Sequence, residues 1–234
     1  MAQKELKLSP RLACIASLVP RGASLADVGT DHGYLPAYLL QSGRIRHAIA
    51  SDIAAEPLAR ARQTAEELCC SEMEFRLCAG LTAILPGECD TIAVAGMGGE
   101  TIIEILSAAP WTRDGMHVAI LQPQTKIELL RRWLAESGYR CMQERLVRDR
   151  EKLYVVLAVA AGTRYVLSEE QAYGGFALER DELYGEYLAV QTARLRRRAE
   201  GLERSGSAAE AERFFALARA MDARKGEWEN GKGT

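Results

Sequence analysis

The side chains with the clearest capacity for chemistry lie in one acidic, glycine-containing turn at residues 25–36 (LADVGTDHGYLP). Gly29 and Gly33 permit positive φ angles and close approach of a ligand, and the free N–H groups at the start of the next helical stretch favour an oxygen-rich group. Asp27 and Asp31 add two carboxylates to the same turn. A dinucleotide loop instead needs Gly-x-Gly-x-x-Gly, so that pyrophosphate meets bare backbone. The turn therefore favours a ligand with an ammonium or sulfonium charge, and S-adenosylmethionine carries both.

A further acid, Asp52, ends the second apolar run of the chain. Nucleoside-binding α/β folds place an acid at this position to accept hydrogen bonds from the ribose hydroxyls. A carboxylate at a strand end can also cap the helix that follows. Because Asp52 occurs together with the acidic turn, we favour the ribose role.

Two more strand ends carry residues that suit ligand binding. The fourth apolar run ends in Ala95-Gly96-Met97-Gly98-Gly99, which leaves the backbone bare beside the crevice where such sheets bind ligands. We interpret it as a catalytic or substrate-contacting loop, although a tight strand-to-helix turn is the alternative. Gln122 follows the fifth run and offers both a donor and an acceptor that can contact a base edge.

A doubly wound α/β sheet would bring these strand ends together, since the apolar runs recur at βαβ spacing. Strands are predicted at 25–28, 47–53, 73–77, 91–95 and 116–121, and helices at 34–42, 56–68 and 126–137. Ser9 as N-cap and Pro10 at the first helical position predict one more helix, which Pro20 and Gly22 end.

The rest of the chain indicates an edge hairpin and a helical appendage. Residues 139–148 and 152–160 resemble adjacent strands, and the short polar turn between them predicts an antiparallel hairpin at the sheet edge. Helical spacing at 178–203 and 208–228, around Ser205-Gly206-Ser207, predicts an antiparallel, coiled-coil-like helical hairpin. We therefore expect two domains, an α/β domain at 1–165 and the helical hairpin at 168–234.

Composition is that of an ordinary globular protein, with 48% hydrophobic residues, 26% charged residues and a net charge of −2. No stretch resembles a leader or a membrane span, so we expect a cytoplasmic protein with no membrane partner. The six cysteines contain no Cys-x-x-Cys pair and the three histidines are scattered, so we expect no metal site. An acidic middle, 22–125, lies between basic segments at 1–21 and 126–164. This pattern suits a polyanion at the rim and a cationic ligand inside, with solvated helix faces as an equal alternative.

Four motifs taken together resemble the bacterial tRNA (adenine(22)-N1)-methyltransferase family. They are Leu8-Ser9-x-Arg11-Leu12, the segment from Asp27 to Pro36, Ala95-Gly96-Met97-Gly98-Gly99, and Leu121-Gln122-Pro123. The resemblance covers essentially the whole chain. It implies a Rossmann-like methyltransferase sheet that uses S-adenosylmethionine, for which the edge hairpin is typical.

The resemblance also implies which residues surround the cofactor. They are Asp27, Gly29, Thr30, Asp31, His32, Gly33, Asp52, Ile53, Ala79, Gly80, Leu81, Ala95 and Gly96. One position departs from the family pattern, which usually has Asp or Asn before Gly-Leu to hold the adenine amino group. With Ala79 there, either backbone groups make that contact or cofactor affinity is reduced.

Methylation of adenine at N1 requires little acid–base help, because the neutral ring nitrogen already has a lone pair, so positioning should dominate. The product is cationic, and Asp31 is our candidate to stabilise the developing charge, unless it binds the cofactor amino group. Tyr34 could hold the unstacked base or only pack on its own helix. With Met97 and Gln122, these residues form the expected catalytic set.

A tRNA partner would be bound through basic side chains outside this set. The expected contacts are Lys7, Arg11, Lys126, Arg131, Arg132, Arg194, Arg196, Arg197 and Arg198.

Three other functions fit less well. A methyltransferase of the same fold could act on another RNA position or on a small molecule, although the helical hairpin disfavours a small substrate. A catalytically silent RNA-binding scaffold would account for Ala79. An NAD-dependent oxidoreductase is disfavoured by the acids in the first turn.

Overall fold

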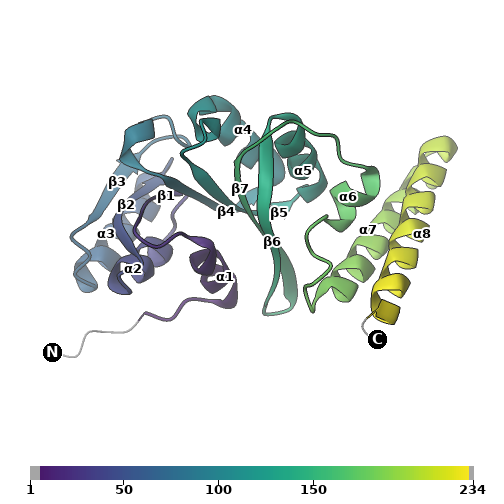
Figure 1. Cartoon of the computed structure of the whole chain (residues 1–234), viewed down its shortest axis with the longest axis horizontal. Coiled ribbons are helices and arrows are strands. Elements are labelled where there is room, and N and C mark those ends of the chain that lie inside the picture. Colours follow the sequence, from purple (N-terminus) through teal and green to yellow (C-terminus); the bar gives the residue numbers. More distant parts are fainter. Residues whose placement is uncertain (1–5, 232–234) are drawn as a thin grey trace. The chain divides into compact units, whose positions relative to one another are not determined.

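The computed structural model describes residues 6–231 and divides into two compact units, Met1–Tyr165 and Val166–Thr234. The first unit is a mixed sheet covered by helices, and the second is helical (Figure 1). Within the described residues, no helix combines the length and the apolar character needed to cross a bilayer.

The sheet of the first unit has seven strands in the order β3-β2-β1-β4-β5-β7-β6. The first five strands along the chain pair in parallel, whereas β7 is antiparallel to β5 and forms an edge hairpin with β6. This confirms the predicted doubly wound sheet and its edge hairpin. The strand bounds are β1 (Ala23–Val28), β2 (Ile45–Asp52), β3 (Met73–Leu77), β4 (Thr91–Gly98), β5 (Val118–Thr125), β6 (Tyr139–Asp149) and β7 (Lys152–Ala161).

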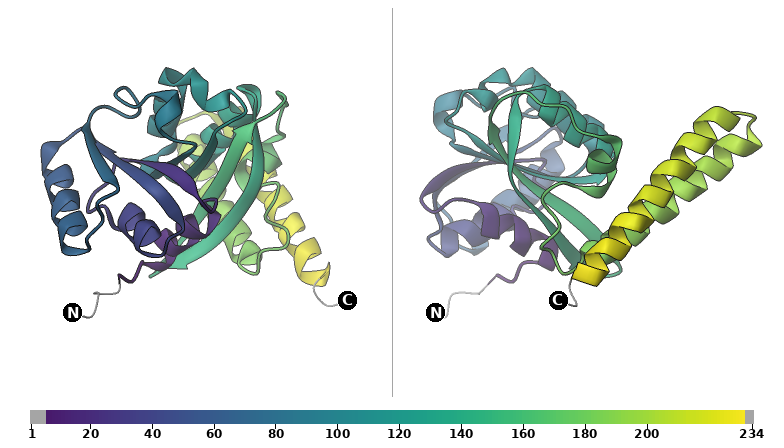
Figure 2. Two further views of the ribbon diagram at one scale, coloured as in Figure 1. Left: turned by 60° about the vertical axis from the view of Figure 1, so that its left-hand side comes forward. Right: turned by 45° about the vertical axis from the view of Figure 1, so that its right-hand side comes forward.

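Helices cover both faces of this sheet, with α1, α2 and α3 on one face and α4 and α5 on the other (Figure 2). Their bounds are α1 (Pro10–Leu18), α2 (Tyr34–Gln41), α3 (Ala55–Glu67), α4 (Gly99–Ala108) and α5 (Ile127–Glu136), with short 3-10 turns at Pro86–Glu88 and Pro110–Arg113. The Ser9 hydroxyl accepts a hydrogen bond from the backbone N–H of Leu12, so the predicted cap of α1 is present. Helix α4 was not predicted, because it begins at Gly99 directly after a glycine-rich strand end.

The strand order reverses between β1 and β4, which are neighbours in the sheet although β2 and β3 separate them in sequence. Val28, the last residue of β1, pairs with Val94, so the segment that leaves β1 begins beside the carboxyl-terminal half of β4. Open α/β sheets bind ligands at such a reversal, outside the carboxyl ends of the strands. Strand β4 continues beyond its predicted end to Gly98, with register irregularities at Met97 against β5.

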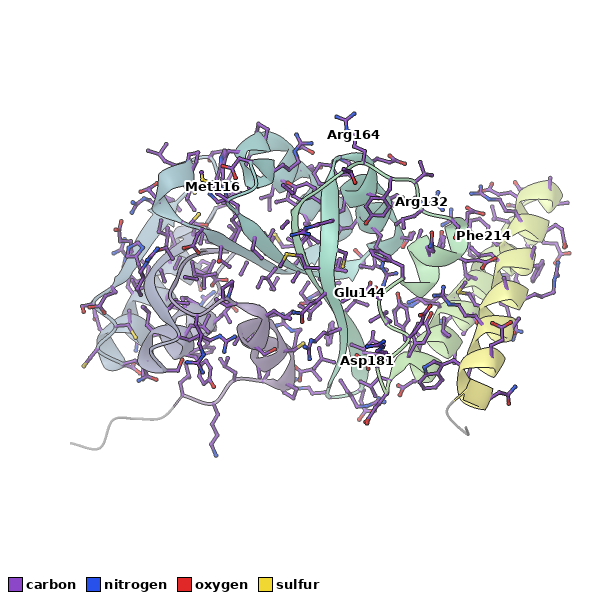
Figure 3. The ribbon with its side chains drawn as sticks, viewed as in Figure 1. Met116, Arg132, Glu144, Arg164, Asp181 and Phe214 are labelled. Atoms are coloured by element: carbon purple, nitrogen blue, oxygen red, sulfur yellow. The ribbon has the colours of Figure 1, made fainter. Side chains whose placement is uncertain are left out.

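A buried ion pair corrects one predicted tRNA contact. Arg131 on α5 is only 1% exposed and donates from Nε to the carboxylate of Glu144 on β6 at 2.8 Å. Figure 3 labels Glu144 in the middle of β6. A guanidinium enclosed in this way cannot reach a phosphate backbone, so the assignment of Arg131 to tRNA was wrong.

The second unit contains α6 (Glu169–Gly174) and an antiparallel pair, α7 (Tyr184–Arg204) and α8 (Ala208–Gly231). Helix α7 starts six residues later than predicted, since the Asp181 carboxylate accepts the N–H of Leu183 and forms a turn before the helix. The interior of the pair holds apolar side chains from both helices, among them Tyr187, Leu195 and Phe214. Gly185 leaves room for the ring of Trp228, which a Cβ would approach to 2.5 Å.

Candidate functional site

The acidic turn leaves β1 as a backbone loop that is tied to the end of β2. The N–H groups of Gly29 and Thr30 both donate to the carbonyl of Ser51, at 2.8 and 3.0 Å. Gly29 and Gly33 have φ angles of +75° and +65°, in the left-handed region that favours glycine. A Cβ on Gly33 would also lie 3.0 Å from the Cβ of Ala61 on α3. The glycines therefore have the structural role that their spacing predicts.

The loop borders a first cavity of about 390 Å³ at the carboxyl ends of β1 and β4. Charged groups of both signs line it: Asp27 and Asp31 from the turn, and Arg11 from α1. The complete lining is Arg11, Leu12, Asp27, Gly29, Thr30, Asp31, His32, Gly33, Tyr34, Leu35, Ala95 and Gly96. Nine predicted cofactor-binding or catalytic residues thus come together around one space.

A second cavity of about 350 Å³ lies beyond the ends of β1, β2 and β3. Its predicted members are Gly29, Asp52, Ile53, Ala79, Gly80, Leu81 and Met97. Helix α4 adds Thr101, Glu104, Ile105 and Ala108, which the sequence analysis missed. Their spacing of three and four residues, which places side chains on one helix face, was the available indication.

The two cavities adjoin at Gly29, which lines both. The Met97 side chain fills the space above this glycine, because a Cβ on Gly29 would lie 2.0 Å from the Met97 Cε. A side chain at position 29 would therefore displace Met97, which lies where the cavities meet.

Asp27 is buried, with 7% of its surface exposed, at the floor of the first cavity. Burial raises the pKa of its carboxyl group to about 6, and the nearby Thr30 hydroxyl lowers it by a smaller amount. A cationic group in the cavity would favour the ionised carboxylate and offset this cost.

Arg11 also belongs to this cavity. Its guanidinium donates to the side-chain oxygen of Gln122 at 2.8 Å and lies 5.8 Å from the centre of the Tyr154 ring. The guanidinium lies close to Gly96, since a Cβ on Gly96 would be 3.9 Å from Arg11 Nη1. Arg11 was expected at the rim as a tRNA contact, but it presents hydrogen-bond donors inside the cavity.

The side chain of Gln122 is buried and hydrogen-bonded within the protein, so it is not accessible to a base. It is fully buried, its oxygen accepts from Arg11 and from the N–H of Gly96 at 3.2 Å, and its nitrogen donates to the carbonyl of Pro123 at 2.9 Å. The expectation that Gln122 contacts a base edge was therefore wrong. The side chain instead joins Arg11 to the glycine loop.

Asp31 is exposed on the opposite side of the first cavity. Its Oδ1 accepts a hydrogen bond from Nη2 of Arg60 on α3 at 2.6 Å, a partner that the sequence analysis did not identify. The rings of His32 and Tyr34 stack with centroids 5.1 Å apart and planes within 6°. Tyr34 is 42% exposed, so the pair forms a flat aromatic surface that a base could stack upon.

Asp52 lines the second cavity, and its Oδ1 accepts the N–H of Ala54 at 2.8 Å. This hydrogen bond forms a turn before α3, which has no side-chain cap, and the ribose role of Asp52 stays a prediction. Ile53 is 76% exposed beside it and offers an apolar surface to a flat ring.

The remaining candidates for tRNA contacts differ in the exposure and pairing of their charged groups. Lys126 pairs with Glu100 at 2.5 Å, Arg196 pairs with Asp222, and Arg198 lies 4.2 Å from the centre of the Phe214 ring. Lys7, Arg194 and Arg197 are exposed, and Arg132, labelled in Figure 3, is partly buried. Arg194 and Arg197 are three residues apart on α7 and so share one face of it.

The side chains around the two cavities fit S-adenosylmethionine. A buried carboxylate, a guanidinium and an acid at the end of β2 match an amino-acid end and a ribose, and the glycines leave bare backbone between them. Among the described residues, no group of three His, Cys, Asp or Glu side chains could hold a metal ion.

Comparison with known proteins agrees with this geometry. A family model described as a methyltransferase domain matches residues 8–157, which together with the fold and the two cavities defines an S-adenosylmethionine-dependent methyltransferase. The tRNA (adenine(22)-N(1))-methyltransferase of Bacillus subtilis is 38% identical over 188 residues, covering 80% of this chain and 77% of the relative. The chain belongs to the tRNA (adenine(22)-N1)-methyltransferase family.

Solved structures of relatives have the same fold along nearly the whole chain. The Bacillus subtilis tRNA methyltransferase superposes with a TM-score of 0.83 at 29% identity, covering 93% of this chain and 99% of that one. A relative from M. capricolum, solved with the cofactor product S-adenosylhomocysteine, gives a TM-score of 0.76 at 25% identity over 92% of this chain and 98% of that one.

Replacing Asp27 by Asn should stabilise the protein at neutral pH. The pKa of about 6 in the native state exceeds the ordinary value of 3.8, so the native state binds more protons between these values and stability falls as pH rises through them. We expect Asp27→Asn to raise the free energy of unfolding by about 3 kcal/mol at pH 7.5 and by almost nothing at pH 3.5, measured by urea denaturation.

Asp114 provides a control, because its substitution should change the stability in the opposite direction. Hydrogen bonds from His117 and the N–H of Met116 lower the pKa of Asp114, so Asp114→Asn should destabilise the protein at pH 7.5. If Asp27→Asn raised the free energy of unfolding at pH 3.5 as well, the buried charge would not be the cause of the stabilisation.

Proposed function

We propose that this protein transfers the methyl group of S-adenosylmethionine to N1 of adenine 22 in tRNA. The observation that carries the proposal is the first cavity, which buried Asp27 and cationic Arg11 line together with the bare backbone of Gly96. An α-amino-acid zwitterion complements this pair of charges, and family membership supplies the expected RNA target.

We assign the two ends of the cofactor to the two cavities. Asp27 would hold the ammonium group and Arg11 the carboxylate, while Asp52 and the exposed face of Ile53 would hold the nucleoside in the second cavity. Ala79 leaves this space without the polar side chain usual in the family, so backbone groups of residues 79–81 would contact the adenine edge. When bound, S-adenosylmethionine supplies an electrophilic methyl group.

The target base would then enter the first cavity from the side of Tyr34. N1 lies on the Watson–Crick edge, so the base must leave its stack or pair, and the His32–Tyr34 stack offers a flat surface to receive it. Neutral N1 carries its own lone pair and requires no base. The chain contributes position, and the Asp31 carboxylate stabilises the positive charge that develops on the ring.

The RNA backbone would contact cations outside the cavity. The exposed side chains of Lys7, Arg194 and Arg197 could contact phosphates directly. Lys126 and Arg196 would first have to give up their ion pairs with Glu100 and Asp222. We rank Arg132 and Arg198 below these five. We expect the protein to act in the cytoplasm, where tRNA is modified, and we propose no metal for the reaction.

The test of this function is transfer of labelled methyl to unmodified bacterial tRNA, with the modified base mapped. We expect label on N1 of adenine 22, none on a tRNA carrying guanosine at that position, and a loss of at least tenfold in kcat/KM for Asp31→Ala. Label at another base would instead support a different RNA position. Cofactor binding without any transfer would favour the silent RNA-binding scaffold.

Arg11 and the exposed arginines of α7 should affect different ligands. Arg11→Met should raise the Kd of S-adenosylhomocysteine about tenfold, because a charge-assisted hydrogen bond is lost, and leave tRNA affinity within twofold. The double variant Arg194→Glu and Arg197→Glu should weaken tRNA binding and reduce its salt dependence, with cofactor affinity unchanged. Calorimetry and filter binding measure the two affinities, and a loss of tRNA binding alone for Arg11→Met would refute its cavity role.

A further inference from the structure

Helix α3 contacts the acidic loop at two adjacent residues. Arg60 donates from Nη2 to Oδ1 of Asp31 at 2.6 Å, and Ala61 packs against Gly33 so closely that a Cβ there would lie 3.0 Å away. Arg60 is itself held on the helix, since Nη1 donates to Glu56 one turn earlier at 2.7 Å. A salt bridge and a packing contact therefore fix the same short loop onto one helix face.

The ion pair adds little to overall stability. The side chain of Asp31 is 70% exposed and that of Arg60 is 34% exposed, and pairs of this kind contribute 0 to about 1 kcal/mol. Its local effect is larger, because an exposed aspartate on a loop otherwise samples several rotamers. With Oδ1 bound to Arg60, the carboxylate is fixed in direction at the edge of the first cavity.

We propose that Arg60 is a positioning residue, which orients the Asp31 carboxylate toward the charge that develops on the target base. This inference rests on the proposed function. The guanidinium partly neutralises Asp31, so it weakens attraction for any cation in the cavity while fixing where the carboxylate lies. Its removal should therefore slow the reaction without weakening cofactor binding.

Arg62 provides a matched control on the same helix. Its guanidinium lies 4.4 Å from the centre of the Phe75 ring, and it has no contact with the loop among the described residues. Arg60→Met and Arg62→Met remove the same charge and the same donors from positions two residues apart. Only the first removes the contact with Asp31.

The first measurement does not depend on activity. Hydrogen exchange of the peptide that covers residues 25–36 should become severalfold faster in Arg60→Met and remain unchanged in Arg62→Met, with both variants unfolding at the wild-type temperature. Unchanged exchange in Arg60→Met would overturn the proposal, whether or not the protein methylates tRNA.

The second measurement is a double-mutant cycle with Asp31→Asn. Arg60→Met should lower kcat about tenfold and leave the Kd of S-adenosylhomocysteine within threefold of wild type. In the Asp31→Asn background, the same substitution should lower kcat less than twofold. An equal loss in both backgrounds, or a loss of cofactor affinity in place of kcat, would overturn the role through Asp31. If wild-type protein methylates no tRNA, the proposed function fails, and the exchange experiment still decides whether Arg60 orders the loop.

Discussion

The carboxylate of Asp27 is buried at the point where the strand order of the sheet reverses, and the rest of the site is arranged around it. The rise of its pKa to about 6 corresponds to a cost of about 3 kcal/mol for keeping the group ionised at neutral pH. This desolvation cost lowers the stability of the folded protein, and a cation bound in the cavity would offset it. The buried charge therefore favours a cationic ligand and disfavours pyrophosphate at the same strand end.

Several features keep the space beside Asp27 open. The loop can pass over the end of β1 because Gly29 and Gly33 adopt left-handed backbone conformations. Gln122 links Arg11 to the N–H of Gly96. A cation is thereby held within the same cavity as two carboxylates, which suits the opposite charges of an amino-acid group.

The sequence predicts the sheet and the edge hairpin, because apolar periodicity and turn residues express backbone requirements directly. Glycine spacing and the family resemblance together predict most of the residues that line the two cavities. It does not show which way a polar side chain at a strand end points, so the burial of Gln122 was missed. The burial of Arg131 could have been predicted, since helical spacing places it on the same face of α5 as Ile127 and Leu134. Its ion-pair partner could not, because Glu144 lies on another element. The contact between Arg60 and Asp31 likewise depends on the tertiary approach of α3 to the loop.

We propose that the acidic cavity binds the amino-acid end of a cationic cofactor and excludes a dinucleotide. The most direct measurement is calorimetric titration of the intact protein with S-adenosylhomocysteine and, separately, with NAD at pH 7.5. We expect one-to-one binding of S-adenosylhomocysteine to the wild-type protein, no detectable heat with NAD, and no heat with S-adenosylhomocysteine in Asp27→Asn. Binding of NAD with comparable affinity, or binding of S-adenosylhomocysteine that is indifferent to Asp27, would contradict it.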